Sequence, residues 1–287
     1  MKTHVGKKQF GSMIALCLFA GIGFTTATST ATAQEQASGA MPPPPKVLVI
    51  MREFLKPGKA GAAHQKTESA FVQAFTAAQW PEHYIAMNSL SGRPRTLFFL
   101  GYDSFADWQK DISDTAKNAT LSQAFDSAQE ADGKLLKSYD SGVFIYQPDK
   151  SVGTGVDIAH MRYMAITMIK VRPGHGEDWD ALVKMHNSIF GKMPNAHWAM
   201  FQKAYGADSS GVNLVITPMK SLAEVDQNRA AAHEAWSSVS ADQKKKIGDL
   251  EASTFESIET NLFAFDPKMS YAPDTWKKAD PGFWGQQ

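Results

Sequence analysis

VLVIMREFLKPGKAGAAHQ occupies residues 47–65, and YMAITMIKVRPGHGEDWDA occupies residues 163–181. Each stretch begins as an apolar run, passes through one basic residue into a Pro-Gly pair, and continues with a helix-like pattern. The two Pro-Gly pairs begin at Pro57 and Pro173. Because one chain contains the same pattern twice, the sequence indicates a tandem duplication.

Two further matches follow in the same order along the chain. YDSFADWQ at Tyr102 matches MKSLAEVDQ at Met219, and DSGVFIYQPDKS at Asp140 matches ETNLFAFDPKMS at Glu259. The separation of the matched segments drifts by only a few residues, as small loop insertions would cause. Three anchors in one order predict two repeats, at residues 46–150 and 160–267, joined by a linker at 151–159.

Inside each repeat, strand-like and helix-like patterns alternate. In the first repeat we expect strands at 46–54, 83–90, 95–102 and 142–147, and helices at 59–80, from Ser104 and at 120–138. In the second we expect strands at 162–171, 196–203, 212–217 and 262–265, and helices at 176–190, from Ser221 and from Ser240. The resulting order, βαββαβ, is that of the ferredoxin-like fold.

The ferredoxin-like arrangement leaves one face of its sheet without helices. Here that face would carry large apolar side chains, which a soluble domain does not leave exposed to water. The predicted fold class is therefore α+β. Two tandem ferredoxin-like units pack sheet to sheet as a pseudo-twofold α+β barrel, and one chain supplies both.

The N-terminal region predicts export. Lysines near the start precede a short apolar run and a small-residue stretch ending at Ala33, which is typical of a secretory signal peptide at residues 1–33. The apolar run is too short for stable membrane insertion. Residues 34–45 contain four consecutive prolines and are interpreted as a Pro-rich spacer, and residues 268–287 as a C-terminal tail. We expect a periplasmic or extracellular protein.

Charge and cysteine content narrow the function classes. The chain has 29 Lys and Arg against 29 Asp and Glu, and loss of Lys2, Lys7 and Lys8 would leave about three net negative charges. That balance argues against a nucleic-acid partner. The only cysteine, Cys17, lies in the predicted signal peptide. The mature chain therefore has no disulfide and depends on its core for stability.

The tandem of strand, Pro-Gly turn and helix, with VFIYQP at 143–148 and LFAFDP at 262–267, resembles the dimeric α+β barrel superfamily. That superfamily includes antibiotic-biosynthesis-type monooxygenases, NIPSNAP-like proteins and the haem enzyme chlorite dismutase. The resemblance covers residues 46–267. It implies the barrel fold but does not select a function, because the superfamily includes enzymes and members without known activity.

Strand residues are the main site candidates, because alternate ones point into the barrel. Glu53 lies in step with the apolar residues of the first strand and is expected to be an acid or base inside the barrel. His83 and Tyr84 begin the second strand of one repeat, and His197 and Trp198 occupy the matching place in the other. We expect Glu53 and His83 as catalytic candidates and the other three as ligand-binding residues, although aromatic packing would produce the same pattern.

Helix residues give weaker signals. His186 shares the apolar stripe of helix 176–190 and would be the axial ligand in a haem-binding alternative; a packed core histidine is the simpler interpretation. His64 and Glu68 lie one turn apart and could form a carboxylate-oriented base or simply the border of an amphipathic helix. No H-E-x-x-H motif or His/Cys cluster is present, so neither a metal site nor an obligatory cofactor is expected.

Two functions from different classes follow. In the first, the exported barrel binds a small apolar molecule or acts as an interaction module. In the second, it is an oxidoreductase, either cofactor-free like the monooxygenases or haem-dependent like chlorite dismutase.

Overall fold

The structure, a computed structural model, describes residues 42–286, which all belong to one compact unit of the chain at residues 40–287. The predicted signal peptide at 1–33, residues 34–41 of the predicted spacer, and residue 287 lie outside the described residues.

The first repeat supplies four strands and three helices. They are β1 (Val47–Leu55), α1 (Ala62–Ala77), β2 (Tyr84–Ser89), β3 (Arg95–Tyr102), α2 (Phe105–Lys117), α3 (Ala119–Gly133) and β4 (Leu136–Tyr146). Two short 3-10 turns, η1 (Pro148–Lys150) and η2 (Ile158–His160), lie in the connection to the second repeat.

The second repeat has the same order of elements and a short helical tail. They are β5 (Tyr163–Val171), α4 (Gly176–Phe190), β6 (Ala199–Tyr205), β7 (Val212–Met219), α5 (Ala223–Ser237), α6 (Ala241–Thr254), β8 (Phe255–Phe265), α7 (Asp274–Ala279) and α8 (Pro281–Trp284).

The eight strands close into an antiparallel barrel in the order β1-β3-β2-β8-β5-β7-β6-β4. Each repeat contributes four adjacent strands, β4-β1-β3-β2 and β8-β5-β7-β6, which is the strand order of a ferredoxin-like sheet. The predicted fold class is confirmed. The two sheets share one interior and bury the apolar faces that helices leave uncovered.

Two seams join the repeats, and both are short. β2 pairs with β8 from Met87↔Phe265 to Ser89↔Phe263, and β4 pairs with β6 over a similarly short stretch that contains a register shift. Segments that follow the last strand of each repeat extend both seams. Ser270 accepts a hydrogen bond from the Ala86 amide at 2.9 Å, and Ser151 accepts one from the Met200 amide at 2.9 Å.

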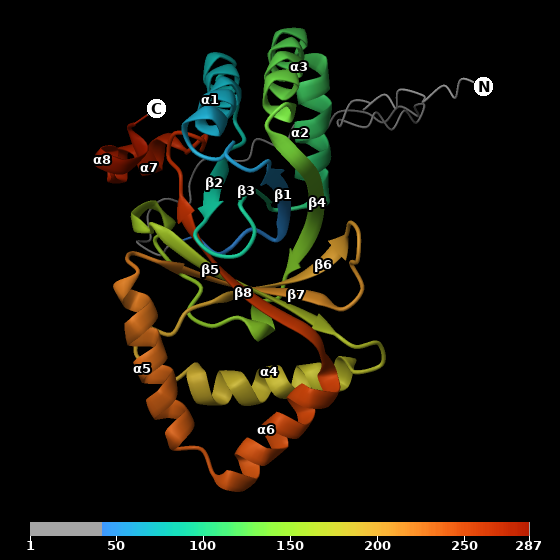
Figure 1. Ribbon diagram of the computed structural model, residues 1–287, viewed down its shortest axis with the longest axis vertical. Coiled ribbons are helices and arrows are strands. Elements are labelled where there is room, and N and C mark those ends of the chain that lie inside the picture. The colour runs from blue at the N-terminus through green and yellow to red at the C-terminus, as the bar shows by residue number, and fades with distance from the viewer. Residues whose placement is uncertain (1–41, 287) are drawn as a thin grey trace, which may run out of the picture. The chain divides into compact units, whose positions relative to one another are not determined.

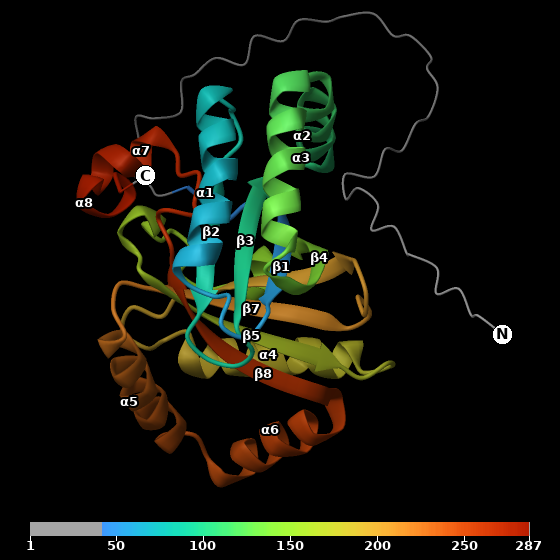
Figure 2. The same ribbon diagram turned by 45° about the horizontal axis from the view of Figure 1, so that its top comes forward.

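Helices cover the barrel on two sides. Figures 1 and 2 show α1, α2 and α3 beyond one side of the strands and α4, α5 and α6 beyond the opposite side. Large apolar side chains fill the barrel interior, including Ile50, Met87, Leu97, Ile166, Leu214 and Phe263. None of the helices in residues 42–286 combines the length and apolar character needed to cross a membrane.

The repeated Pro-Gly pair makes the turn that leads from the first strand of each repeat toward its helix. Gly58 has φ 75° and Gly174 has φ 87°, in the left-handed region that favours glycine. Proline followed by glycine at positive φ matches the central pair of a type II turn. The repeated sequence therefore encodes a repeated change of chain direction.

Most predicted boundaries agree with the structure to within a few residues. The exceptions are the last strand of each repeat and the helix predicted at 120–138, which ends at Gly133 as α3 because residues 136–138 belong to β4. β4 begins at Leu136 and β8 at Phe255, several residues earlier than predicted. Their first parts carry many exposed polar side chains and pair with β1 and β5. That pairing is not visible in the local pattern of apolar residues.

Candidate functional site

A cavity of about 680 Å³ lies at one end of the barrel and is the main candidate for a binding site. Its deeper wall is apolar and includes Leu48, Ile85, Phe99, Met164, Phe201 and Ile216. A concave apolar site with a few polar groups is the usual composition of a small-molecule pocket.

His83, His197 and Trp198 all lie in the wall of this cavity, which we call the histidine cavity. His83 immediately precedes β2, and His197 and Trp198 immediately precede β6, the equivalent strand of the second repeat. The structure thus brings together three of the five strand candidates. Both ring nitrogens of His197 lie near carbonyl oxygens, with Nε2 2.6 Å from the Pro218 oxygen.

His83 is held in a defined orientation. Its Nδ1 lies 3.2 Å from the carbonyl oxygen of Tyr271, which can only accept, so Nδ1 carries the proton and donates. In the neutral ring Nε2 is then the basic nitrogen. Burial lowers the pKa of His83 from its ordinary value of 6.5, and the hydrogen bond to Tyr271 offsets part of that effect.

The proline spacer forms part of the cavity wall. Pro42 through Pro45 line it, and Pro45 packs against Gly101 of β3. A Cβ at Gly101 would lie 2.8 Å from Pro45 side-chain atoms, so only glycine allows this close approach. The described part of the predicted spacer, residues 42–45, therefore packs against the candidate site.

Tyr84 does not line the histidine cavity, contrary to the expectation for a ligand-binding residue. It is buried between the sheet and α1, where its ring makes an edge contact with Phe75 at 5.5 Å and lies 6.4 Å from Tyr271. Successive strand residues point to opposite faces, so His83 and Tyr84 cannot both face the cavity. Tyr84 is a packing residue of the outer layer.

Glu53 also points away from the barrel interior, so its predicted inward direction is wrong. Leu48 and Ile50 belong to the interior core, and Glu53 therefore faces outward with Val47 and Val49 toward the helices. Both faces of β1 are apolar and buried. The alternation of the sequence therefore does not reveal which face lies inside.

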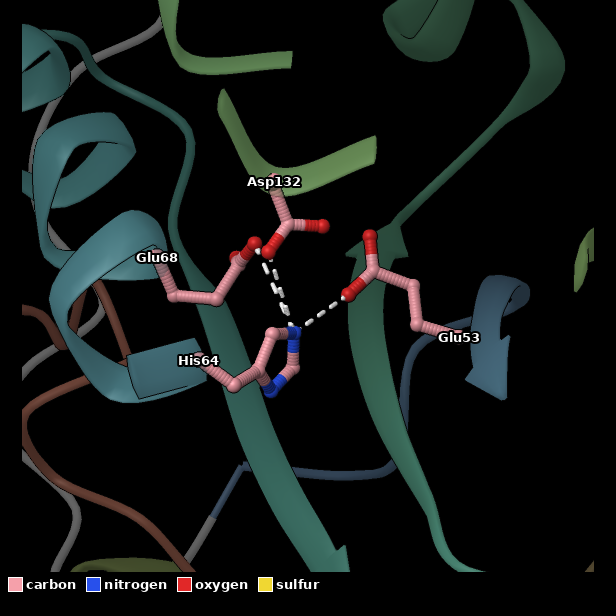
Figure 3. Close-up of side chains that lie close together, drawn as sticks. All are labelled: Glu53, His64, Glu68 and Asp132. Atoms are coloured by element: carbon pink, nitrogen blue, oxygen red, sulfur yellow. Dashed lines mark hydrogen bonds and ion pairs between the residues drawn. The ribbon is translucent and has the colours of Figure 1, made fainter. Parts of the chain in front are cut away.

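Glu53 instead belongs to a buried group with His64, Glu68 and Asp132, which we call the carboxylate–histidine cluster (Figure 3). β1 supplies Glu53, α1 supplies His64 and Glu68, and α3 supplies Asp132. Nε2 of His64 lies 2.9 Å from Glu53 Oε2, 3.4 Å from Asp132 Oδ1 and 3.8 Å from Glu68 Oε1. One donor atom from each residue lies within 4.8 Å of all the others, so the four could hold a metal ion.

Burial controls the electrostatics of this cluster. It raises the pKa of Glu53 and of Asp132 above their ordinary values and raises that of Glu68 furthest. The neighbouring carboxylates raise the pKa of Glu68 further. For Glu53, the hydrogen bond with His64 offsets part of the effect of burial.

Sequence reasoning identified three members of the cluster separately and missed Asp132. The i, i+4 spacing of His64 and Glu68 on an apolar helix face was a usable signal, because a buried face rarely carries two ionisable groups without partners. Asp132 lies far along the chain, near the end of α3. Only the packing of α3 beside α1 brings it to His64.

His186, the candidate axial ligand for haem, lies outside both barrel cavities. It is on α4, its side chain is 36% exposed, and its Nε2 lies 3.1 Å from Oε1 of Glu251 on α6. The residues that line the two cavities do not include it. Neither of these two cavities therefore places a haem beside His186.

The opposite end of the barrel contains a second cavity of about 470 Å³ with a more charged wall. Arg52 forms a two-point ion pair with Asp140 there, and Arg95 and Lys203 add positive charge. Burial lowers the pKa of Arg95 and of Lys203. The two barrel ends thus differ in degree: the first is mainly apolar with histidines and several acidic side chains in its wall, and the second has more basic side chains.

No family model and no curated protein matches the chain. Among solved structures, it is similar to a candidate monooxygenase from Fusobacterium nucleatum subsp. nucleatum, with a TM-score of 0.50 and 10% identity over 78% of this chain and 94% of that one. An anthrone oxidase-like protein gives a TM-score of 0.48 and 16% identity over 77% and 92% of the two chains. A variant of chlorite dismutase from Candidatus Nitrospira defluvii gives 0.45 and 12% over 82% and 95%. At this identity the likeness to the Fusobacterium protein is one of fold alone.

Proposed function

We propose that this protein binds a small, largely apolar molecule in the histidine cavity. The observation that supports the proposal is the cavity itself, about 680 Å³ of space with an apolar inner wall and two histidines at its rim. That volume lies within the range typical of small-molecule sites. The apolar wall supplies the affinity, and the few polar groups orient the bound molecule.

The outer part of the cavity suits a ligand with one hydrogen-bonding group. Nε2 of a neutral His83 accepts a hydrogen bond, because its Nδ1 donates to the Tyr271 carbonyl. Trp198 offers a flat apolar surface close by in the same wall. An aromatic alcohol or phenol has both features and is the ligand class that we favour.

Binding of 1-naphthol, measured by isothermal titration calorimetry, tests this proposal. Ala199 lines the cavity at the start of β6, and Ala199→Phe should fill the space and reduce affinity at least tenfold. Ala230 is exposed on α5, so Ala230→Phe is a matched control that should bind as the wild type does. Equal affinity of the wild type and Ala199→Phe would disprove the proposal.

A second candidate function is a cofactor-free oxidoreductase, and the orientation of His83 favours it. A neutral imidazole whose Nδ1 is already committed presents Nε2 as a base, and the lowered pKa keeps it unprotonated at neutral pH. Such a base can remove the proton of a bound phenol. Oxygen consumption by wild type but not by His83→Ala, with 1-naphthol binding retained, would support an enzyme; no consumption by either would leave a binding module of the NIPSNAP-like kind.

We also propose that the mature protein acts outside the cytoplasm. The support is the basic start, short apolar run and small-residue exit of residues 1–33. N-terminal sequencing of protein from fractionated cells should find a chain that begins near Gln34 in the exported fraction. A chain beginning at Met1 in the cytoplasmic fraction would contradict the proposal.

A further inference from the structure

His64 faces three carboxylates with one defined ring nitrogen. Its Nδ1 lies 3.4 Å from Thr96 Oγ1, and Thr96 donates its own hydroxyl proton to Asn88 Oδ1 at 2.6 Å. The hydroxyl oxygen therefore accepts from Nδ1–H, and Nε2 shares a proton with the Glu53 carboxyl at 2.9 Å. When a metal ion displaces that proton, the Nε2 lone pair faces the cluster. A metal-ligating histidine is usually oriented in this way, with its second nitrogen donating to a fixed acceptor.

Glu68 provides an independent observation. The residue is 3% exposed, and its carboxyl group interacts with that of Asp132. Within residues 42–286 its Oε1 has no hydrogen-bond partner, and Nε2 of His64 lies 3.8 Å from it. Figure 3 shows its carboxylate pointing into the cluster toward His64 and Asp132. A buried carboxylate oxygen without a hydrogen-bond partner costs free energy, which indicates that the four side chains alone do not complete the site.

The charge of the cluster points to a cation. Among the described residues, no Lys or Arg forms an ion pair with Glu53, Glu68 or Asp132, and His64 is their only basic neighbour within ion-pair distance. Three ionised carboxylates beside a neutral imidazole would carry three negative charges in a buried space, and burial opposes that state by raising the pKa of each carboxyl group. A bound dication offsets most of that charge and gives Glu68 Oε1 a partner.

The separations suit one ion at the centre. Two ligands bound about 2.1 Å from the same metal lie about 3.0 to 4.2 Å apart, depending on their angle. The distances from Nε2 of His64 to the three carboxylates run from 2.9 to 3.8 Å. Small side-chain adjustments are therefore enough to form a coordination shell.

From these observations we propose that Glu53, His64, Glu68 and Asp132 bind one divalent first-row transition-metal ion between the sheet and the helices of the first repeat. Imidazole favours such ions over calcium and magnesium, and carboxylates suit Mn²⁺ and Fe²⁺ among them. All four ligands are buried and come from β1, α1 and α3. The ion is therefore a structural one that ties two helices to the sheet, and the proposal does not depend on ligand binding in the histidine cavity.

Uptake of Mn²⁺ by the full-length, chelator-treated protein tests the site. Electron paramagnetic resonance should show loss of the free Mn²⁺ signal with a stoichiometry of one, and thermal unfolding should shift upward. Glu68→Gln should weaken binding at least tenfold, because it replaces a charged ligand with a neutral one. Glu251→Gln is the control and should bind Mn²⁺ as the wild type does. Glu251 lies near His186, and among residues 42–286 it belongs to no group of three or more possible metal ligands.

A second variant keeps the test decisive if Glu68→Gln does not fold. Thr96→Val leaves all four ligands in place and removes the acceptor that orients His64, together with the hydrogen bond from Thr96 to Asn88. It should weaken Mn²⁺ binding about 10- to 100-fold. Folding of each variant is checked by near-ultraviolet circular dichroism. If the folded wild type binds none of Mn²⁺, Fe²⁺ and Zn²⁺, or if Thr96→Val binds as tightly as wild type, the cluster is a proton-sharing network and the proposal is wrong.

Discussion

The two repeats have the same strands and helices but different layers between sheet and helix. In the first repeat this layer contains Glu53, His64 and Glu68, and in the second repeat its buried residues include Ile169, Trp179 and Val183. Both layers are buried. Since the apolar version builds the same fold, the ionisable residues of the first repeat are not required by the architecture.

This difference separates what the fold needs from what a site adds. The fold needs a closed barrel and helices with one buried face. A layer with ionisable residues and an apolar layer both provide that buried face. Burying carboxylates costs free energy that an apolar layer avoids, so a second role has to offset it. A similar contrast exists at the barrel ends, where one cavity has more charged side chains in its wall than the other.

The largest effect should follow from breaking the apolar layer. Trp179 is 6% exposed and packs edge-on against Phe255 at 6.1 Å. Trp179→Ala should lower the free energy of unfolding by about 3 to 5 kcal/mol, measured by guanidinium denaturation. Trp179→Phe is the control and should cost far less, because the indole Nε1 has no partner among the described residues; a loss below about 1 kcal/mol for the alanine variant would show that this layer is dispensable.

Making the first layer resemble the second should remove its dependence on metal. Mn²⁺ at 100 times its dissociation constant should raise the free energy of unfolding of the wild type by about 2.7 kcal/mol. The double variant Glu53→Ile with Glu68→Val should show no such response, since one histidine and one aspartate remain. Without metal its free energy of unfolding should equal that of the metal-free wild type or exceed it by up to a few kcal/mol, because apolar groups have replaced two buried carboxyl groups.

Metal-free denaturation curves of both proteins provide the check on that comparison. A double variant less stable than the metal-free wild type would mean that the carboxylates stabilise the layer by themselves.

Equivalent residues beside the second strand of each repeat should differ in their effect on ligand affinity: substitution of Trp198 should weaken binding, and substitution of Tyr84 should not. Trp198→Ala should weaken 1-naphthol binding about tenfold, which corresponds to about 1.4 kcal/mol, with little change in stability. Tyr84→Phe should leave affinity unchanged, because Tyr84 lies outside the cavity and its buried hydroxyl has no partner among the described residues. Calorimetry on both variants tests the assignment, and weaker binding by Tyr84→Phe would contradict it.

The smallest effect concerns pH. The pKa of His83 is lowered in the folded state, so folding favours the neutral ring. The resulting stabilisation is complete above the unfolded pKa of about 6.5 and is lost as pH falls through the lower folded pKa. Melting temperatures of His83→Gln should therefore fall less than those of wild type between about pH 7.5 and about pH 5.

His233→Gln, at an exposed position on α5, serves as the control and should follow the wild-type curve. Identical slopes for wild type and His83→Gln would show that the environment of His83 does not contribute.

Much of the fold was predictable because local signals and the repeat agreed. Helix α4 and strand β3 have the predicted bounds, and Ser104 caps α2 by accepting from the Asp107 amide at 3.1 Å. The first parts of β4 and β8 were not predictable, because their polar side chains lack the apolar pattern typical of a strand. They are strands because they pair with β1 and β5, which are distant in the sequence.

The candidate sites were less predictable for a related reason. Equivalence of the repeats was enough to place His83 and His197 at the same barrel end. The direction of Glu53 depends on which of the two buried faces of β1 points into the barrel. The position of Asp132 depends on how α3 packs beside α1. Both are properties of tertiary packing, and the spacing of residues along the chain does not reveal them.

The seams between the repeats have a consequence for the order of events during synthesis. The segment after β8 reaches back to the strand β2, where the Tyr84 amide donates to the Tyr271 carbonyl at 3.1 Å and Ala86 to Ser270. A ribosome therefore completes nearly the whole chain before the barrel is able to close. Until then the nascent first repeat has a bare apolar sheet face and two open strand edges, which are the features that promote aggregation and recruit chaperones.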